Sequence, residues 1–236
     1  MLNLFPFTIF PLGDSAITID FGNCIDDELN NQVPQLYEYI YQNLFDGLIE
    51  CVPAYSSLTI YYNAVALKKD CRNNKTISDM VSEKLEEMLM RKKDFSLVAP
   101  RNLKVPVCYD DEFAPDMKYI IKEKKISKQE LIKLHTQHTY RVYMIGFLPG
   151  FAYMGELDAK ITINRKTSPQ NVSKGSVGIA GNQTGIYPMD SPGGWNIIGK
   201  TPVELYETDE NGMNTYFKAG DIVQFFSISK NEFENY

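Results

Sequence analysis

The chain has 236 residues, which allows one large domain or two small ones at roughly 150 residues per domain. Its 44% hydrophobic residues are enough for a substantial core, and 24 basic against 30 acidic residues leave a net charge of −6, which argues against a nucleic-acid-binding face. The longest apolar stretch, residues 143–155, is interrupted by glycine and proline and is shorter than the ~20 residues of a spanning helix, so no membrane role is predicted.

The N-terminal residues 1–13 are apolar but contain no basic residue, and Pro6 and Pro11 interrupt them, so they make a poor secretory signal. The four cysteines are Cys24, Cys51, Cys71 and Cys108. Scattered cysteines without an export signal are more often reduced than paired. We therefore predict a cytoplasmic protein.

The first hundred residues predict a small α+β domain over residues 1–97. Period-two alternation or β-rich composition predicts strands at residues 16–21, 49–52 and 57–62. A helix should begin after Asp26, with Pro34 either kinking it or moving its start downstream. The segment Thr76–Asp79 has the form of a capping box and should open a second helix.

Residues 96–102, which include Pro100, are the predicted boundary, and residues 98–236 are the predicted second domain. A strand at 103–107, a short helix around 116–125 and a helix capped at Ser127–Glu130 should come first.

Beyond residue 140 the pattern changes, because ten of the 15 glycines lie in the 54 residues from Gly146 to Gly199. Short alternating runs occur at residues 176–179, 203–206 and 222–226. Many short strands joined by glycine and proline loops predict a β-barrel or a sandwich.

The segment Gly175–Pro188 is the strongest candidate for ligand binding. Its glycines at 178, 181 and 185 would let the backbone approach a ligand and leave N–H groups free to cradle an anion. Arg165 and Lys166, a short way upstream, are natural cations for a carboxylate or phosphate. Alternatively, the glycines only turn the corners of a barrel.

Aromatic side chains near this segment could wall a pocket, with Tyr153 among them, and polar ones could orient a ligand. The predicted substrate-binding residues are Phe147, Gly150, Phe151, Gly181, Gln183, Thr184, Tyr187 and Trp195. Arg165 is predicted to act in catalysis by supplying the main positive charge.

The segment Gly194–Thr201 matches the G-x-x-x-x-G-K-T pattern of phosphate loops. A genuine phosphate loop needs a strand before it and a helix after it. Here residues 190–194 predict a turn, and Pro202 follows at once and leads into the strand predicted at 203–206. We interpret the match as a coincidence and expect Lys200 to face solvent in a turn.

Only two histidines occur, His135 and His138, and no metal-ligand spacing accompanies them, so no metal site is predicted. His138 should fall at the end of the helix. His135 is predicted as a catalytic general base, and the alternative is a structural histidine hydrogen-bonded within the fold. No Ser–His–Asp or Cys–His assembly can be assigned from the spacing.

Three blocks of the sequence resemble the KipI/PxpB family, also called allophanate hydrolase subunit 1. The first is Phe10-Pro-Leu-Gly-Asp-Ser-Ala16 with Val52-Pro-Ala-Tyr-Ser-Ser57. The second is Ile145-Gly-Phe-Leu-Pro-Gly-Phe-Ala-Tyr153. The third is Gly175–Pro188, running into Ser191-Pro-Gly-Gly-Trp-Asn-Ile-Ile-Gly-Lys-Thr-Pro202.

The resemblance implies an α+β N-terminal domain followed by a cyclophilin-like β-barrel domain. It also implies a hetero-oligomeric, ATP-dependent 5-oxoprolinase, in which PxpC-like and PxpA-like subunits join this one to open 5-oxo-L-proline to L-glutamate. ATP would be bound by the partner or shared with it. Some family members are instead named as inhibitors of a sporulation histidine kinase, so a non-enzymatic binding protein of a histidine kinase is the alternative.

The sequence departs from the family pattern ahead of the glycine-rich block. Arg165 is retained, but Gln170 stands where relatives usually carry a second cation, so an anion would be held more weakly or with help from Lys174. The position of Lys200 is commonly Arg in the family, which further weakens the phosphate-loop interpretation.

Overall fold

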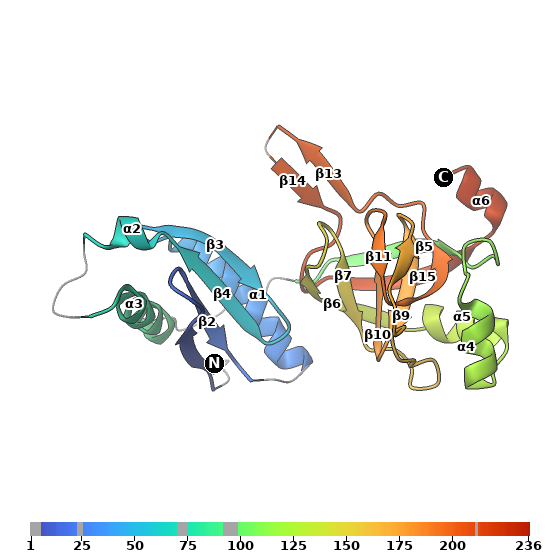
Figure 1. The fold of residues 1–236 in the computed structure, drawn as a ribbon, viewed down its shortest axis with the longest axis horizontal. Helices are drawn as coiled ribbons and strands as arrows, with labels where there is room; N and C mark the ends of the chain where they lie inside the picture. The colour runs from blue at the N-terminus through green and yellow to red at the C-terminus, as the bar shows by residue number, and fades with distance from the viewer. Residues whose placement is uncertain (1–5, 23–25, 70–74, 92–98, 211) are drawn as a thin grey trace. The chain divides into compact units, whose positions relative to one another are not determined.

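A computed structural model describes residues 6–22, 26–69, 75–91, 99–210 and 212–236 (Figure 1). The chain divides into two compact units, Met1–Ala99 and Pro100–Tyr236, each with its own hydrophobic core. The boundary segment predicted at 96–102 lies partly outside the described residues, as do Cys24 and Cys71; Cys51 and Cys108 are buried free thiols. None of the helices described is both long enough and apolar enough to cross a membrane.

The first unit is a four-stranded antiparallel sheet with the strand order β1-β2-β4-β3. Its strands are β1 (Thr8–Pro11), β2 (Ala16–Asp20), β3 (Leu48–Pro53) and β4 (Ser57–Tyr62). Its helices are α1 (Asp27–Gln42), the single turn α2 (Ala64–Leu67) and α3 (Ile77–Arg91). Leu36 of α1 and Leu85 of α3 pack with Ile17 and Ile60 of the sheet in one core.

Local signals predicted most of this unit. The three predicted strands are confirmed to within a residue or two, whereas β1 was not predicted. Asp26 caps α1 by accepting the Leu29 N–H at 2.9 Å, and Thr76 and Asp79 bond reciprocally at the start of α3. Pro34 lies inside α1, so it does not move the start of the helix downstream.

The second unit is a closed seven-stranded barrel with the order β10-β7-β6-β15-β5-β12-β9, which confirms a barrel rather than a sandwich (Figure 1). The strands are β5 (Asn102–Cys108), β6 (Thr139–Ile145), β7 (Ala152–Gly155), β9 (Ser176–Ala180), β10 (Gln183–Ile186), β12 (Asn196–Lys200) and β15 (Ile222–Ile228). Only β15 and β5 pair in parallel among these strands. Val105, Ile179 and Phe225 lie in the core that the barrel encloses with its helices.

Shorter elements surround the barrel. The helices α4 (Met117–Lys124) and α5 (Lys128–Thr136) precede β6, and Ser127 caps α5 by accepting the Glu130 N–H. Two further antiparallel pairs are β8 (Gln170–Val172) with β11 (Ser191–Gly193), and β13 (Tyr206–Asp209) with β14 (Gly212–Thr215). The chain ends in α6 (Lys230–Glu234), and the β13–β14 hairpin projects from the barrel in Figure 1.

Three local predictions in this unit are wrong. Residues 201–205 form no strand, because the alternation there reflects core packing of Val203 and Leu205 rather than strand pairing. Residues 191–193 form β11 instead of a turn, since they pair with β8. Lys200 is the last residue of β12, where its backbone is opposite Ser176 and Cys108. Each outcome depends on partners distant in the sequence.

Candidate functional site

The outer side of the barrel at β7, β9 and β10 carries the predicted site. Side chains alternate along β10, and Thr184 and Ile186 are fully buried on its inner side. Gln183, Gly185 and, just beyond the strand, Tyr187 therefore belong to its outer side. On β7, Ala152 and Met154 are buried on the inner side, so Tyr153 between them belongs to the outer side.

Five predicted aromatic residues come together on this outer side. The ring centroids of Phe151 lie 5.4 Å from Trp195, 5.3 Å from Tyr187 and 4.8 Å from Tyr153, all edge to face. The ring centroids of Phe147 and Phe151 lie 5.6 Å apart, and those of Tyr153 and Trp195 lie 5.9 Å apart, both pairs edge to face. We call these five rings together with Arg165 the Trp195 face. Edge-to-face packing of this kind fixes the rings relative to one another.

Two glycines of the predicted ligand-binding segment make room for the side chain of Trp195. Gly178 and Gly185 are opposite each other in the β9–β10 ladder, and a Cβ on either would lie 3.1 Å from a carbon of Trp195. The N–H of Gly181, predicted as free for an anion, instead donates to the Ile163 carbonyl at 2.6 Å. The geometry thus fits the structural alternative better than an anion cradle.

Arg165 is exposed, but its backbone is held on both sides. The Asn196 side-chain amide donates to the Asn164 carbonyl at 3.0 Å, and the Lys166 N–H donates to the Gly194 carbonyl at 2.7 Å. The Arg165 guanidinium lies against Gly194, where a Cβ would be 3.1 Å from Nη2. Within the described part of the chain, no carboxylate forms a salt bridge with Arg165, so its charge is available to a ligand.

The two tyrosines of the Trp195 face remain protonated at neutral pH. Burial raises the pKa of Tyr153, with the positive charge of Arg165 acting in the opposite direction. Burial also raises the pKa of Tyr187, opposed by the Trp195 backbone N–H and by Arg165. The Tyr187 hydroxyl fits against Gly193, where a Cβ would lie 2.5 Å from it. The face therefore combines the cation of Arg165 with two neutral phenols, of which Tyr153 is half-buried and Tyr187 fully buried.

The other predicted cations already have acidic partners. Lys166 Nζ lies 2.6 Å from Asp116 Oδ2, which also accepts the Ile197 N–H at 2.6 Å, and both side chains are about 15% exposed. Lys174 Nζ lies 2.6 Å from a Glu204 carboxylate oxygen, so Lys174 is not placed to compensate for Gln170.

His135 is fully buried inside the barrel unit, and both of its ring nitrogens are hydrogen-bonded. The Thr184 hydroxyl gives its proton to the Gly178 carbonyl, so it accepts from His135 Nε2–H at 2.9 Å. The other nitrogen, Nδ1, then accepts from the Tyr109 hydroxyl at 2.7 Å. The ring stacks on Phe225 at 4.6 Å, and burial lowers the pKa of His135 to about 3. These contacts fit the structural alternative, since a general base needs a free lone pair facing the substrate.

Other predicted residues lie at the margin of the face or outside it. Phe147 is 59% exposed and adopts a positive φ of 69°, which is uncommon for a residue with a side chain. Gly150, at φ +82°, has no room for a side chain because the Leu205 carbonyl would lie 2.8 Å from its Cβ. His138 lies beyond the end of α5, with Nε2 3.6 Å from Asp158.

The phosphate-loop match lacks the required helix, because β12 is followed by irregular chain. Lys200 is half-buried and its ammonium lies 5.9 Å from the centre of the Phe113 ring. No cluster of three or more potential metal-binding side chains occurs among the residues that the structure describes.

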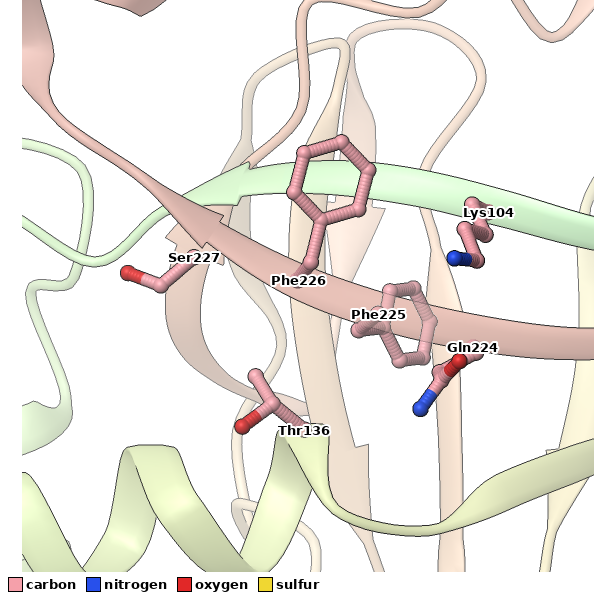
Figure 2. A pocket seen from close by; sticks show the side chains of 6 residues that line it. All are labelled: Lys104, Thr136, Gln224, Phe225, Phe226 and Ser227. Atoms are coloured by element: carbon pink, nitrogen blue, oxygen red, sulfur yellow. The ribbon is translucent and has the colours of Figure 1, made fainter.

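A separate depression of about 520 Å³ contains none of the predicted site residues (Figure 2). It is lined by Lys104, Thr136, Gln224, Phe225, Phe226 and Ser227. These residues come from β5, α5 and β15, and no sequence motif points to them. We place the candidate site at the Trp195 face, because the convergent cation, phenols and rings are there.

Sequence reasoning missed the positioning residues Gly193, Gly194, Asn196 and Asp116. The Ser-Pro-Gly-Gly-Trp-Asn run is visible in the sequence, but it overlaps the false phosphate-loop match, which hides its role beside Arg165. Asp116, some fifty residues from Lys166, carries no local signal.

Residues 7–216 match a family model described as carboxyltransferase domain, subdomain C and D. The chain is 41% identical over 232 residues to a protein of Bacillus subtilis (strain 168) that is named as a 5-oxoprolinase subunit, covering 98% of this chain and 96% of that protein. It is 29% identical over 187 residues to the 5-oxoprolinase subunit of the same name from Escherichia coli O157:H7, covering 78% and 81% of the two chains.

Among solved structures, TTHA0988 superposes with a TM-score of 0.74 at 29% identity, and the alignment covers 91% of this chain but only 40% of that longer chain. The Kluyveromyces lactis urea carboxylase superposes with a TM-score of 0.72 over 97% of this chain and 22% of its own, and at 14% identity it shows the fold alone. The family match over most of the sequence and the 41% identity over nearly all of it show that the chain belongs to the KipI/PxpB family.

Proposed function

We propose that this chain is a subunit of a cytoplasmic, ATP-dependent 5-oxoprolinase, which acts with PxpC-like and PxpA-like subunits to convert 5-oxo-L-proline to L-glutamate. The name of the Bacillus subtilis relative supports the reaction. The observation that carries the proposal is the Arg165 guanidinium. It lies against Gly194, its positive charge acts on Tyr153 and Tyr187, and within the described residues no carboxylate forms a salt bridge with it.

The Trp195 face fits the chemistry of 5-oxoproline, a flat five-membered lactam bearing one carboxylate. Arg165 can bind the carboxylate with two parallel hydrogen bonds. Trp195 and Tyr153, both half-buried, offer ring surfaces for the lactam. Burial raises the pKa of Tyr153, so its ring presents a neutral phenol to the lactam.

Opening the lactam is unfavourable, and coupling to ATP supplies the driving force. The phosphate-loop match at residues 194–201 does not fit a nucleotide site, since no helix follows it. The proposal therefore assigns ATP to a partner subunit or to a surface shared with it. This chain binds and orients the substrate, with Arg165 touching it, and the enclosed His135 positions Thr184 on β10.

Reconstitution tests the proposal. The full chain is mixed with its PxpA-like and PxpC-like subunits, and ATP-dependent release of glutamate from 5-oxoproline is measured. We expect activity only in the complete mixture. A folded chain that adds no activity to the other subunits but inhibits autophosphorylation of a histidine kinase would contradict the proposal.

Binding can be measured separately, because Trp195 is the only tryptophan of the chain. Adding 5-oxoproline should change its fluorescence in a saturable way. The compound 2-pyrrolidone, which has the same ring without the carboxylate, should bind more weakly by about tenfold or more, since it lacks the charged partner of Arg165.

A further inference from the structure

The charges around the Trp195 face leave Arg165 as its one available cation among the described residues. Asp116 neutralises Lys166 through an ion pair with 2.6 Å between Nζ and Oδ2. The same Nζ also donates to the neutral Gln170 Oε1 at 3.1 Å. Glu204 neutralises Lys174 in an equally short pair. The partial burial of Lys166 and Asp116, 16% and 15% exposed, protects their pair from screening by salt.

Gln170 lies on the strand β8, next to the Gly193–Gly194 segment that borders the site. It is paired with Gly193 across the β8–β11 ladder, and Gly193 lies against the Tyr187 hydroxyl. The next residue, Asn171, is paired with Pro192 and points to the opposite side of β8, because side chains alternate along a strand. Both side chains are exposed, so either position can accept a larger residue.

We infer that the Trp195 face selects ligands with a single negative charge over phosphates and other dianions, and that the neutral side chain of Gln170 sets this selectivity. The inference rests on the proposed function, since it concerns the same substrate site.

The reason is the cost of an unpaired charge. One guanidinium neutralises one carboxylate, whereas a bound dianion keeps a net negative charge beside the half-buried rings of Tyr153 and Trp195. An apolar surface solvates that charge poorly, so it costs binding free energy. A second cation at position 170 would neutralise it.

Two ligands with the same ring and different charge test the inference. Cyclohexanecarboxylate is a monoanion, and cyclohexyl phosphate is mainly a dianion above pH 7, since the second pKa of a phosphate ester is about 6. Neither absorbs where tryptophan does, so Trp195 fluorescence can report binding to the full chain. We expect the wild type to bind the carboxylate about tenfold more tightly than the phosphate.

Substitutions then assign the selectivity to one position. Gln170→Arg should shift the ratio of the two affinities toward the phosphate by about tenfold, whereas the matched control Asn171→Arg should change it by less than about twofold. Arg165→Gln should remove the response to the carboxylate. Circular dichroism confirms that each variant is folded.

Equal affinities of the wild type for the two ligands, or equal effects of Gln170→Arg and Asn171→Arg, would overturn the inference. Absence of any response to either ligand would overturn it too. A measurement without variants is competition in the reconstituted complex, where cyclohexanecarboxylate should inhibit 5-oxoproline turnover more strongly than cyclohexyl phosphate. Failure of the proposed function is recognised separately, as absence of 5-oxoproline turnover in the complete mixture while the charge selectivity of the isolated chain persists.

Discussion

The guanidinium of Arg165 lies against the Cα of Gly194, with Nη2 and Nε only 3.1 and 3.2 Å from where a Cβ would be. Gly194→Ala should therefore displace the guanidinium rather than the fold, because a long side chain yields more easily than a backbone. We expect the affinity for 5-oxoproline to fall severalfold while the free energy of unfolding changes by less than about 1 kcal/mol. Trp195 fluorescence titration and urea unfolding measure the two quantities.

Gly199→Ala is the contrasting control for this substitution. A Cβ at Gly199 would lie 2.7 Å from Val107 Cγ1 and 2.8 Å from the Cys108 carbonyl oxygen, inside the barrel wall. The backbone oxygen cannot move aside, so overpacking should cost about 1–3 kcal/mol of stability. If Gly194→Ala destabilises the fold as much as Gly199→Ala does, then Gly194 does not act by positioning the Arg165 guanidinium.

Removing the charge of Arg165 should impair the complex. Arg165→Ala is expected to lower kcat/KM for 5-oxoproline by about tenfold or more, which is about 1.4 kcal/mol of transition-state stabilisation. The reconstituted enzyme provides the measurement. Lys160→Ala, which removes an exposed cation that lies 3.9 Å from Glu130, is the control and should leave kcat/KM unchanged. A wild-type rate in Arg165→Ala would remove Arg165 from the site.

The enclosed His135 should make the protein lose stability in mild acid. Its folded pKa is about 3 and its ordinary value 6.5, because burial disfavours the charged ring. Between these values the unfolded chain binds a proton that the folded chain does not, so stability is complete above pH 6.5 and falls toward pH 3. The slope should approach about 1.4 kcal/mol per pH unit. Urea unfolding at pH 7.5, 6.5, 5.5 and 4.5 measures it.

The two histidines provide a clean comparison, since the chain contains no others. His138→Gln should keep the acid-sensitive slope, because it leaves the enclosed His135 in place. His135→Asn should be less stable at neutral pH but show a smaller slope between pH 6.5 and 4.5. The same slope in both variants would show that other groups cause the acid sensitivity.

Lys200 should matter little for nucleotide binding. Its ammonium lies 5.9 Å from the Phe113 ring centre, so Lys200→Ala should cost about 0.5–1 kcal/mol of stability through a lost cation–π contact. Lys200→Arg keeps the contact, and the complex should retain its activity within about twofold. Calorimetric titration of the isolated chain with ATP decides the matter. Tight binding that disappears in Lys200→Ala would mean that the phosphate loop is real.

Elements governed by neighbours in the sequence were predictable. Three helices are capped by hydrogen bonds that span only three residues, from the side chains of Asp26, Thr76 and Ser127. The residue types at these positions therefore indicate where the helices begin. The glycine-rich segment from 146 to 199 predicted a β-barrel or a sandwich, and the structure shows a barrel. The motif blocks predicted the family, which the comparisons confirm. The aromatic residues of the Trp195 face are likewise recognisable from the sequence, and the structure brings them together.

The tertiary structure decided what each of these residues does. Residues 191–193 became a strand and 203–205 did not, since strand pairing depends on segments elsewhere in the chain. Arg165 and Lys166 are adjacent cations that the sequence does not distinguish, yet Asp116 forms an ion pair only with Lys166. Whether a charge is available to a ligand depends on distances between side chains. The hydrogen bonds between Asp116 and Ile197 of β12 bring a carboxylate to Lys166, whereas Arg165 is left beside the aromatic rings.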